Sequence, residues 1–292
     1  MMLKGPRDDA QGTMLMSPKH AAAVAAAPSS LILLRQDFAG SIAVLTLNRP
    51  QTRNSLSEAM LEALGDALTA IAHDRTVRVV VLAANGPAFC SGHDLKELSA
   101  HRTDTDRGRG YFKHIMTACS AMMQQIVALP QPVVAAVQAT ATAAGCQLVA
   151  SCDLAVASRD AKFATPGVNL GLFCSTPMVA VSRNVARKHA MEMLLTGEMV
   201  GAEEAKRIGL VNEVVAPGHE RTAALALAKK IAAKSTLTVK IGKEAFYRQL
   251  EMPLADAYSY ASEVMVQNML ARDAEEGIGA FIEKREPKWE DR

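Results

Sequence analysis

The chain has 292 residues, of which 49% are hydrophobic and 21% are charged, so it can bury one large core or a core with a small helical domain. Its 32 basic and 30 acidic residues give a formal net charge of +2 without a basic block, which does not indicate a nucleic-acid partner. No run of 18 or more apolar residues occurs, which argues against a membrane partner or a spanning helix.

Residues 1–30 mix glycine, proline, charged residues and an alanine run, and we expect them to form a disordered leader. Asp8 and Asp9 are unusual for a transit or secretory signal. From Ser41 the chain is apolar and β-branched up to Leu47, which predicts a strand that ends at Asn48-Arg-Pro.

A helix is predicted after this loop. Ser55-Leu-Ser-Glu58 has the spacing of a capping box, and five apolar residues then recur at helical intervals: Met60, Leu61, Leu64, Leu68 and Ile71. Further strands are predicted at 77–82, 133–137, 154–157, 162–165 and 211–215, with a helix after Asp94 and a short helix ending near Ser151. Strands separated by helices predict an α/β core with mostly parallel pairing, over residues 31–218.

Residues 219–292 are predicted to form a separate helical region. Their apolar periodicity indicates helices at 223–232, 240–250, 255–270 and 274–284, with a break at Pro253.

Two segments point to chemistry, Pro87 to Leu95 and Thr140 to Ala150. Each places small residues directly before a predicted helix, where the first backbone N–H groups have no helical partner. Two such helix starts side by side can form an oxyanion hole, which holds the oxygen of an acyl group. Each segment alone is more often explained by tight packing.

The order of motifs resembles the crotonase superfamily, the enoyl-CoA hydratases and isomerases, from about Ile42 to Trp289. The matching pieces are Asn48-Arg-Pro, Phe89-Cys-Ser-Gly-His-Asp-Leu, Ala144-Gly-Cys-Gln-Leu-Val-Ala-Ser-Cys-Asp-Leu, Thr196-Gly-Glu and Ala202-Glu-Glu-Ala-Lys-Arg-Ile-Gly-Leu-Val-Asn. The resemblance implies a crotonase-like spiral of ββα repeats with a C-terminal helical region that forms trimers. A homotrimer or a hexamer is therefore expected.

The resemblance also implies the binding site. The amides of Ser91 and Ala144 would form an oxyanion hole for a thioester carbonyl, and an acyl-CoA would be the substrate, so that no separate cofactor is needed. Coenzyme A would contact Arg49, Arg53, Ser55 and the stretch from His93 through Asp94 to Leu95, with Phe281 and Lys284 reaching in from a neighbouring subunit. Gln51 departs from the family's common lysine, and Arg53 is a candidate replacement.

The departures that matter most concern catalysis. In hydratases of this family, glutamates occupy the positions of Gln147 and Gly167. Hydration of an enoyl group needs one group to activate water and another to deliver a proton. An amide exchanges no proton at neutral pH and glycine has no side chain, so hydration by two glutamates is not expected here.

Several residues could substitute for the glutamates. His93 titrates near neutrality, although it could equally bond to backbone. Cys174 could lie at a helix N-terminus that favours a thiolate, but a packed, inert thiol is the simpler reading. Asp94 is better suited to stabilising its helix than to proton transfer, and Asn169 could orient water or cap a turn.

Three functions remain open from the sequence. The first is a hydratase or isomerase reaction on an unusual acyl-CoA in fatty acid metabolism, with His93 or water in place of a carboxylate. The second is decarboxylation of a malonyl-type thioester, because loss of CO2 creates the enolate without a strong base; some decarboxylases of the superfamily share Gly-His-Asp. The third is an acyl-CoA-binding protein without turnover.

Metal ions and disulfides are not predicted. The five cysteines are odd in number and show no Cys-x-x-Cys spacing, and the histidines show no metal-ligand spacing. A reducing compartment fits this pattern, the cytoplasm or, for a eukaryotic source, the mitochondrial matrix.

Overall fold

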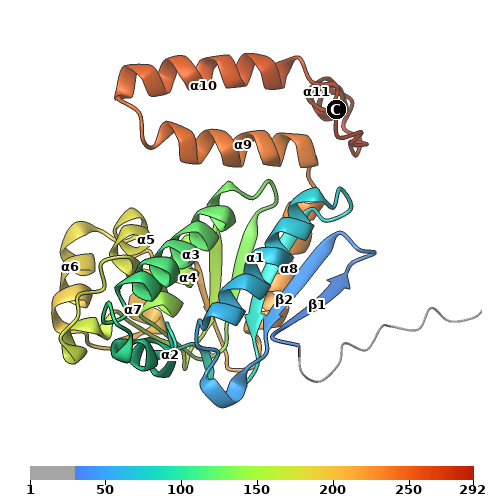
Figure 1. The fold of residues 1–292 in the computed structure, drawn as a ribbon. Coiled ribbons are helices and arrows are strands. Elements are labelled where there is room, and N and C mark those ends of the chain that lie inside the picture. Colours follow the sequence, from blue (N-terminus) through green and yellow to red (C-terminus); the bar gives the residue numbers. More distant parts are fainter. Residues whose placement is uncertain (1–29) are drawn as a thin grey trace, which may run out of the picture.

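The computed structural model describes residues 30–292, shown in Figure 1. The expected leader therefore lies outside the described residues, apart from Ser30. Six strands form the larger sheet in the order β1-β2-β3-β5-β7-β10. They are β1 (Ile32–Asp37), β2 (Ile42–Leu47), β3 (Val79–Ala84), β5 (Val133–Val137), β7 (Leu154–Ser158) and β10 (Glu213–Val215). All pairs are parallel except β1 with β2, which is antiparallel.

A smaller sheet lies beside it in the order β4-β6-β8-β9. Its strands are β4 (Ala88–Cys90), β6 (Thr140–Thr142), β8 (Lys162–Ala164) and β9 (Val200–Gly201). The chain repeatedly enters the larger sheet, then the smaller sheet, and then a helix. This arrangement confirms the predicted α/β architecture of ββα repeats.

Helix α1 (Glu58–His73) buries the five apolar residues predicted for it. Its N-cap is Ser57, whose hydroxyl accepts from the Met60 N–H at 3.2 Å, and not Ser55 as the capping-box spacing suggested. The remaining core helices are α2 (Leu95–Ala100), α3 (Arg109–Ala128), α4 (Ala144–Ser151), α5 (Pro177–Asn184), α6 (Arg187–Thr196) and α7 (Ala202–Arg207). Three 3-10 turns accompany them, η1 (Pro50–Thr52), η2 (His101–Thr103) and η3 (Pro166–Leu170).

Helix α8 (Glu220–Ala232) belongs to the core and not to the separate helical region predicted from residue 219. Its buried face of Ala224, Ala228 and Ala232 packs against valines of β3 and β5. Small side chains on this face let the helix lie close to the sheet. The boundary of the core therefore moves from residue 218 to the end of α8.

The last three helices stand apart from the core in Figure 1 and are here called the C-terminal arm (residues 236–292). They are α9 (Thr236–Gln249), α10 (Leu254–Met269) and α11 (Arg272–Glu283). Helix α9 has no fully buried residue, so polar contacts carry much of its attachment. Its Lys243 Nζ donates to Asp153 Oδ2 at 2.7 Å, and Tyr247 Oη donates to the other oxygen of Asp153 at 2.9 Å.

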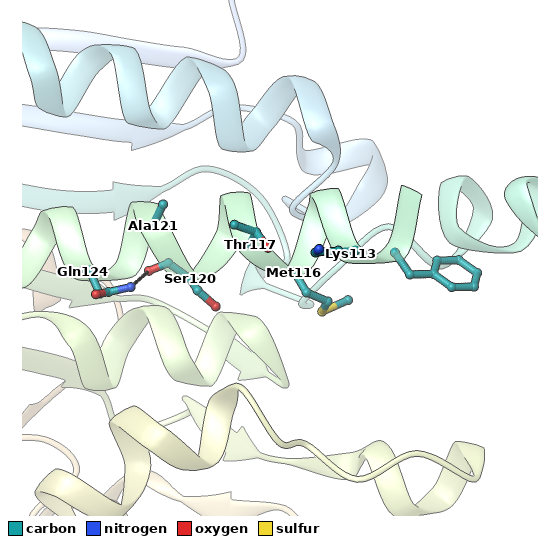
Figure 2. Close-up of a pocket in the computed structure, with 7 residues that line it drawn as sticks. Lys113, Met116, Thr117, Ser120, Ala121 and Gln124 are labelled. Carbon is teal, nitrogen blue, oxygen red and sulfur yellow. Dashed lines mark hydrogen bonds between the residues drawn. The ribbon is translucent and has the colours of Figure 1, made fainter. Parts of the chain in front are cut away.

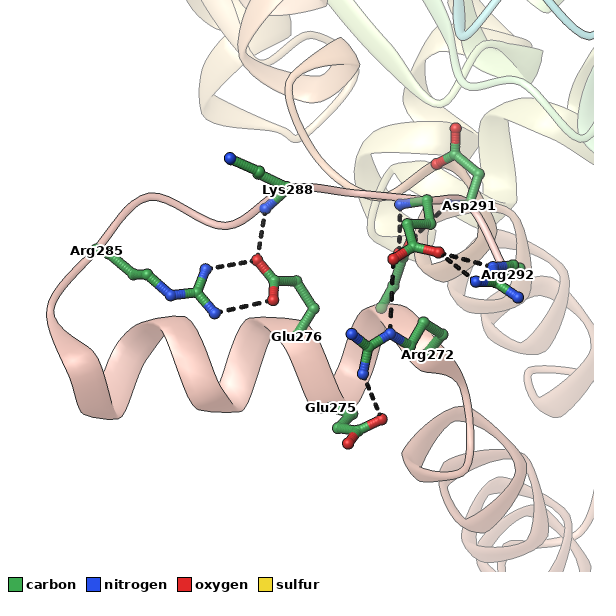
Figure 3. A network of polar contacts seen from close by, with 9 residues as sticks. Arg272, Glu275, Glu276, Arg285, Lys288, Asp291 and Arg292 are labelled. Atoms are coloured by element: carbon green, nitrogen blue, oxygen red, sulfur yellow. Dashed lines mark hydrogen bonds and ion pairs between the residues drawn. The ribbon is translucent and has the colours of Figure 1, made fainter.

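Ion pairs also fold the end of the chain back onto the arm, as Figure 3 shows. Arg285 and the Lys288 N–H both bind the Glu276 carboxylate, which lowers the pKa of Glu276 to about 2. Arg78, just before β3, pairs with Asp291 at 2.8 Å and so joins this tail to the core. No helix among residues 30–292 is long and apolar enough to cross a membrane.

Candidate active site

The two segments singled out in the sequence lie side by side. Strand β4 pairs in parallel with β6, and the Thr142 hydroxyl donates to the Ser91 carbonyl at 3.2 Å. Gly92 has φ +90°, and a Cβ added there would lie 2.9 Å from the Ala143 Cβ and 3.2 Å from the Ala144 nitrogen. Only a glycine allows this approach. Any other residue would place its Cβ against Ala143 and would have to adopt a left-handed backbone conformation.

Ala144 is the first residue of α4, so its N–H has no carbonyl of an earlier helical turn to bond. The residue before it, Ala143, has φ +51° and ψ −120°, a conformation that strains any residue other than glycine. The Ala143 N–H donates to the Ala164 carbonyl at 2.9 Å, which holds the turn against β8. The fold therefore fixes the direction of the Ala144 amide.

The expectation for the Ser91 amide is wrong. The Ser91 N–H already donates to the Arg53 carbonyl at 3.1 Å, so it is not available to a ligand. The next amide, of Gly92, acts on the Cys90 thiol and lowers its pKa against the larger effect of burial. The first amide past this glycine, that of His93, is the remaining candidate from this segment to act beside Ala144.

The His93 side chain is half-buried, and its Nε2 has no hydrogen-bond partner among the described residues. Burial lowers the pKa of His93, which keeps the imidazole neutral near pH 7. A neutral imidazole with a free nitrogen can accept a proton, so the structure retains His93 as a candidate base.

Gln147 lies one turn into α4 and its Oε1 is buried without a partner among the described residues. Side chains of a helix tilt toward its N-terminus, which directs Gln147 back toward Ala143 and Ala144. The Thr165 hydroxyl, fully buried just after β8, also lacks a partner. The sequence analysis did not select Thr165. The structure places it beside the Ala143 turn, because the Ala143 N–H bonds to the carbonyl of the preceding residue, Ala164.

Gly167 is buried in η3, and its N–H donates to the Cys174 sulfur at 3.3 Å. Burial raises the pKa of the Cys174 thiol, so the thiolate considered from the sequence is not favoured.

Asn169 is exposed beside Gly197, and its amide nitrogen would meet a Cβ at that glycine. Leu172, Phe173 and Met178 are exposed apolar residues nearby in the chain.

Some of the predicted coenzyme A contacts from the first half of the chain are joined by hydrogen bonds, although Ser55 itself is buried. The Ser55 hydroxyl donates to Asp94 Oδ2 at 3.1 Å, and an Arg49 guanidinium nitrogen lies 3.4 Å from the Ser57 hydroxyl. Arg53 and Leu95 are exposed and are next to Asn54-Ser55 and Asp94 in the chain. The two arginines supply the positive charge that phosphates prefer.

Asp94 has the structural role that the sequence favoured. Its carboxylate caps α2 by accepting from the Lys96 and Glu97 N–H groups. Burial acts to raise the pKa of Asp94, but the hydrogen bonds from Lys96 N–H and the Ser55 hydroxyl hold it below its usual value. An ionised cap of this kind is not a proton donor.

Asn54 is a residue that the sequence analysis missed. It is fully buried with φ +51°, and its amide nitrogen donates to the carbonyls of Asn85 and Ala88, each at 2.9 Å. Its Oδ1 accepts from the Arg49 N–H at 2.8 Å. Asn54 thus ties the arginine loop to the segment that carries Gly92 and His93.

Phe281 and Lys284 lie on or just after α11 of the C-terminal arm, and Phe281 is 85% exposed. Figure 1 shows α11 on the opposite side of the molecule from α2, which follows Asp94. Within one chain these two residues are therefore not brought to the other predicted contacts.

A hollow of about 510 Å³ lies along α3, lined by Phe112, Lys113, Met116, Thr117, Ser120, Ala121 and Gln124 (Figure 2). It contains none of the predicted catalytic residues. This hollow is open and lies along the outside of one helix, so it does not define the site. The hydrogen bonds around Ala144 define it instead. Among the described residues no cluster of histidine, cysteine and carboxylate side chains could hold a metal ion.

Comparison with known proteins decides the family. Residues 37–292 match the model of the enoyl-CoA hydratase/isomerase family. The chain belongs to that family. The rat mitochondrial protein called enoyl-CoA hydratase domain-containing protein 3 is 49% identical over 84% of this chain and 80% of its own length. This confirms the predicted resemblance.

Solved structures of the family agree with the fold. A crystal structure of an enoyl-CoA hydratase from Mycobacterium smegmatis is 52% identical, with a TM-score of 0.85 over 89% of this chain and 99% of that one. The human enoyl-CoA hydratase domain-containing protein 3 is 46% identical, with a TM-score of 0.84 over 89% of this chain and all of that one. The C-terminal helical arm is thus a feature of the family fold.

The close approach of Gly92 to Ala144 gives a first prediction. Gly92→Ala is expected to weaken acyl-CoA binding about tenfold or more, because its methyl group would stand where a carbonyl oxygen must reach the amide. Isothermal titration with butyryl-CoA measures this. Gly171→Ala is the matched control, since Gly171 also has positive φ but nothing within 4 Å of the added carbon. Equal losses in both variants would contradict the assignment.

The burial of His93 gives a second prediction, on pH. The lowered pKa means that, as pH falls through about 6.5, the unfolded chain takes up a proton that folded His93 resists, so this contribution to stability is lost in acid. His93→Gln should therefore flatten the decline in unfolding free energy between pH 7.5 and pH 5.5. Denaturant titrations measure the slope, with exposed His73→Gln as the control. An unchanged slope in His93→Gln would count against a buried neutral imidazole.

Proposed function

We propose that this protein binds an acyl-CoA thioester and stabilises its enolate between two backbone amides, those of Ala144 and His93. The approach of Gly92 to the Ala143–Ala144 turn carries this proposal, since it brings the two helix-start segments together without a side chain between them. Fixed N–H donors aimed at a developing oxyanion lower the barrier because they need no reorganisation.

The coenzyme A part of the substrate is proposed to lie along Arg49, Arg53, Ser55, Asp94 and Leu95. Phe281 and Lys284 would complete the site from a neighbouring subunit of a homotrimer or hexamer. The strong exposure of Phe281, and of Leu254, Tyr258 and Leu270 on α10 and just after it, supports an assembly that covers them. No cofactor beyond the substrate's coenzyme A is proposed.

The reaction is proposed to be that of a lyase or isomerase without the two glutamates. Gln147 can hold a water molecule or a polar substituent through its unpartnered Oε1, but it cannot exchange a proton. The neutral His93 imidazole, or a water molecule held near it, is then the proton carrier. Free, buried cysteines support a reducing compartment, and the name of the rat relative places that protein in mitochondria.

Decarboxylation of a malonyl-type thioester is a second candidate. The observation in its favour is that neither Gln147 nor Gly167 offers a carboxylate, while the amide pair is retained. Loss of CO2 leaves its electron pair on the α-carbon and produces the enolate directly, so only the oxyanion hole is needed.

One experiment separates these functions. Purified protein is incubated with crotonyl-CoA and with methylmalonyl-CoA, and the products are weighed by mass spectrometry. A gain of about 18 mass units indicates hydration, and a loss of about 44 indicates decarboxylation, by the masses of water and CO2. Isomerisation leaves the mass unchanged but introduces deuterium when the reaction is run in D2O. Binding of both esters with no mass change in either solvent identifies an acyl-CoA-binding protein, and absence of binding rejects the proposed site.

A further inference from the structure

Cys174 lies at the position that a side chain on residue 167 would occupy. A Cβ built on Gly167 would be 2.9 Å from the Cys174 sulfur, a distance that real Cβ atoms essentially never show. It would also lie 3.1 Å from the Leu172 carbonyl oxygen and 3.2 Å from the Cys174 nitrogen. The backbone of Gly167 is not in the positive-φ region, so its conformation alone does not require glycine.

The thiol also bonds to the residue that it displaces. The Gly167 N–H donates to the Cys174 sulfur at 3.3 Å, and Cys174 is only 7% exposed. Because sulfur is large and the site is closed, the thiol fills volume and satisfies the amide of residue 167 at once.

We propose that Cys174 is a specificity-determining residue: its thiol takes the place of a side chain at position 167 and so excludes a carboxylate from this side of the acyl site. Glycine at 167 and cysteine at 174 then form one packing unit and cannot be changed independently. Restoring a glutamate at 167 requires removal of the thiol and a shift of a few tenths of an ångström in the loop at 172–174.

This unit is tested first by stability, without any assumption about substrate. Gly167→Ala, Cys174→Ala and the double variant form a thermodynamic cycle read by thermal unfolding. Gly167→Ala alone should lower Tm by roughly 3–8 °C through overpacking. Much of that loss should disappear when the same substitution is made in the Cys174→Ala background. Gly242→Ala, a helical glycine with nothing within 4 Å of the added carbon, is the control and should lose nothing.

Additive effects in this cycle would overturn the proposal, as would a Gly167→Ala variant as stable as the parent protein. A Tm loss that depends on the Cys174 sulfur, and is absent from Gly242→Ala, is the result that the proposal requires.

The second arm rests on the proposed function and measures chemistry. Gln147→Glu with Gly167→Glu places two carboxylates at the family's glutamate positions, with and without Cys174→Ala. Hydration of crotonyl-CoA should appear, or rise at least about tenfold, only when the thiol is removed. Equal hydration with the thiol present would overturn the proposal. Coupling in stability together with no binding of crotonyl-CoA by any variant would support the packing unit and reject the acyl site instead.

Discussion

Removal of the Ala144 N–H is expected to lower thioester turnover by about 100-fold, the usual effect of losing one oxyanion donor. The reason is geometric: Ala144 is the first residue of α4, its amide has no helical partner, and Gly92 places no side chain against it. Turnover is measured with the thioester that mass spectrometry identifies. Binding of the substrate should change far less, because the donor acts mainly on the charge that develops during reaction.

Two variants make this test specific. Ala144→Pro removes the donor, but proline disfavours the ψ of −120° at the preceding Ala143. An ester bond in place of the peptide N–H of Ala144 removes the hydrogen alone. The same ester at Ala223, whose N–H bonds to the His219 carbonyl in α8, controls for the loss of one hydrogen bond. If the Ala223 ester reduced turnover as much as the Ala144 ester, the oxyanion assignment would fail.

Lys243→Met is expected to reduce the free energy of unfolding by about 3–5 kcal/mol, the usual cost of breaking a buried ion pair by removing one partner. Burial lowers the pKa of Lys243, and the Asp153 carboxylate opposes that shift. Its Nζ also donates to the carbonyls of Ile126 and Gln131, each at 3.1 Å. The substitution therefore leaves a carboxylate and two carbonyls with one donor fewer.

Denaturant unfolding measures this loss, with Lys240→Met as the control. Lys240 is exposed on the same helix, and its substitution should change stability by less than about 0.5 kcal/mol. Similar values for the two variants would show that the Lys243 contact does not hold α9 to the core.

The strands and the first helix could be predicted because their patterns are local. The valine-rich β3 and β5 read as buried parallel strands, and the apolar spacing of α1 matches one helical face. Helix α3 was not predicted, although Ile115, Cys119, Met122 and Ile126 do recur at helical spacing. Short polar and sulfur-containing residues between them weakened the contrast between its faces.

The site could be predicted only as far as segments, not atoms. Sequence spacing pointed to the two helix starts, but it could not show that the Ser91 amide is used by the Arg53 carbonyl. Asn54 carried a local signal, since asparagine tolerates a left-handed backbone better than most residues. The contact of Gly167 with Cys174 depends on how an irregular loop folds back, and no periodicity records that.

The claim that two backbone amides hold a thioester carbonyl is tested most directly by infrared difference spectroscopy of bound butyryl-CoA, with and without a 13C label at the carbonyl carbon. Donors aimed at the oxygen withdraw electron density from the C=O bond, so its stretching frequency should fall when the ester binds. The shift should be smaller in the Ala144 ester variant and unchanged in Gly171→Ala. A bound thioester whose carbonyl absorbs at the same frequency as in water would contradict the proposed oxyanion hole.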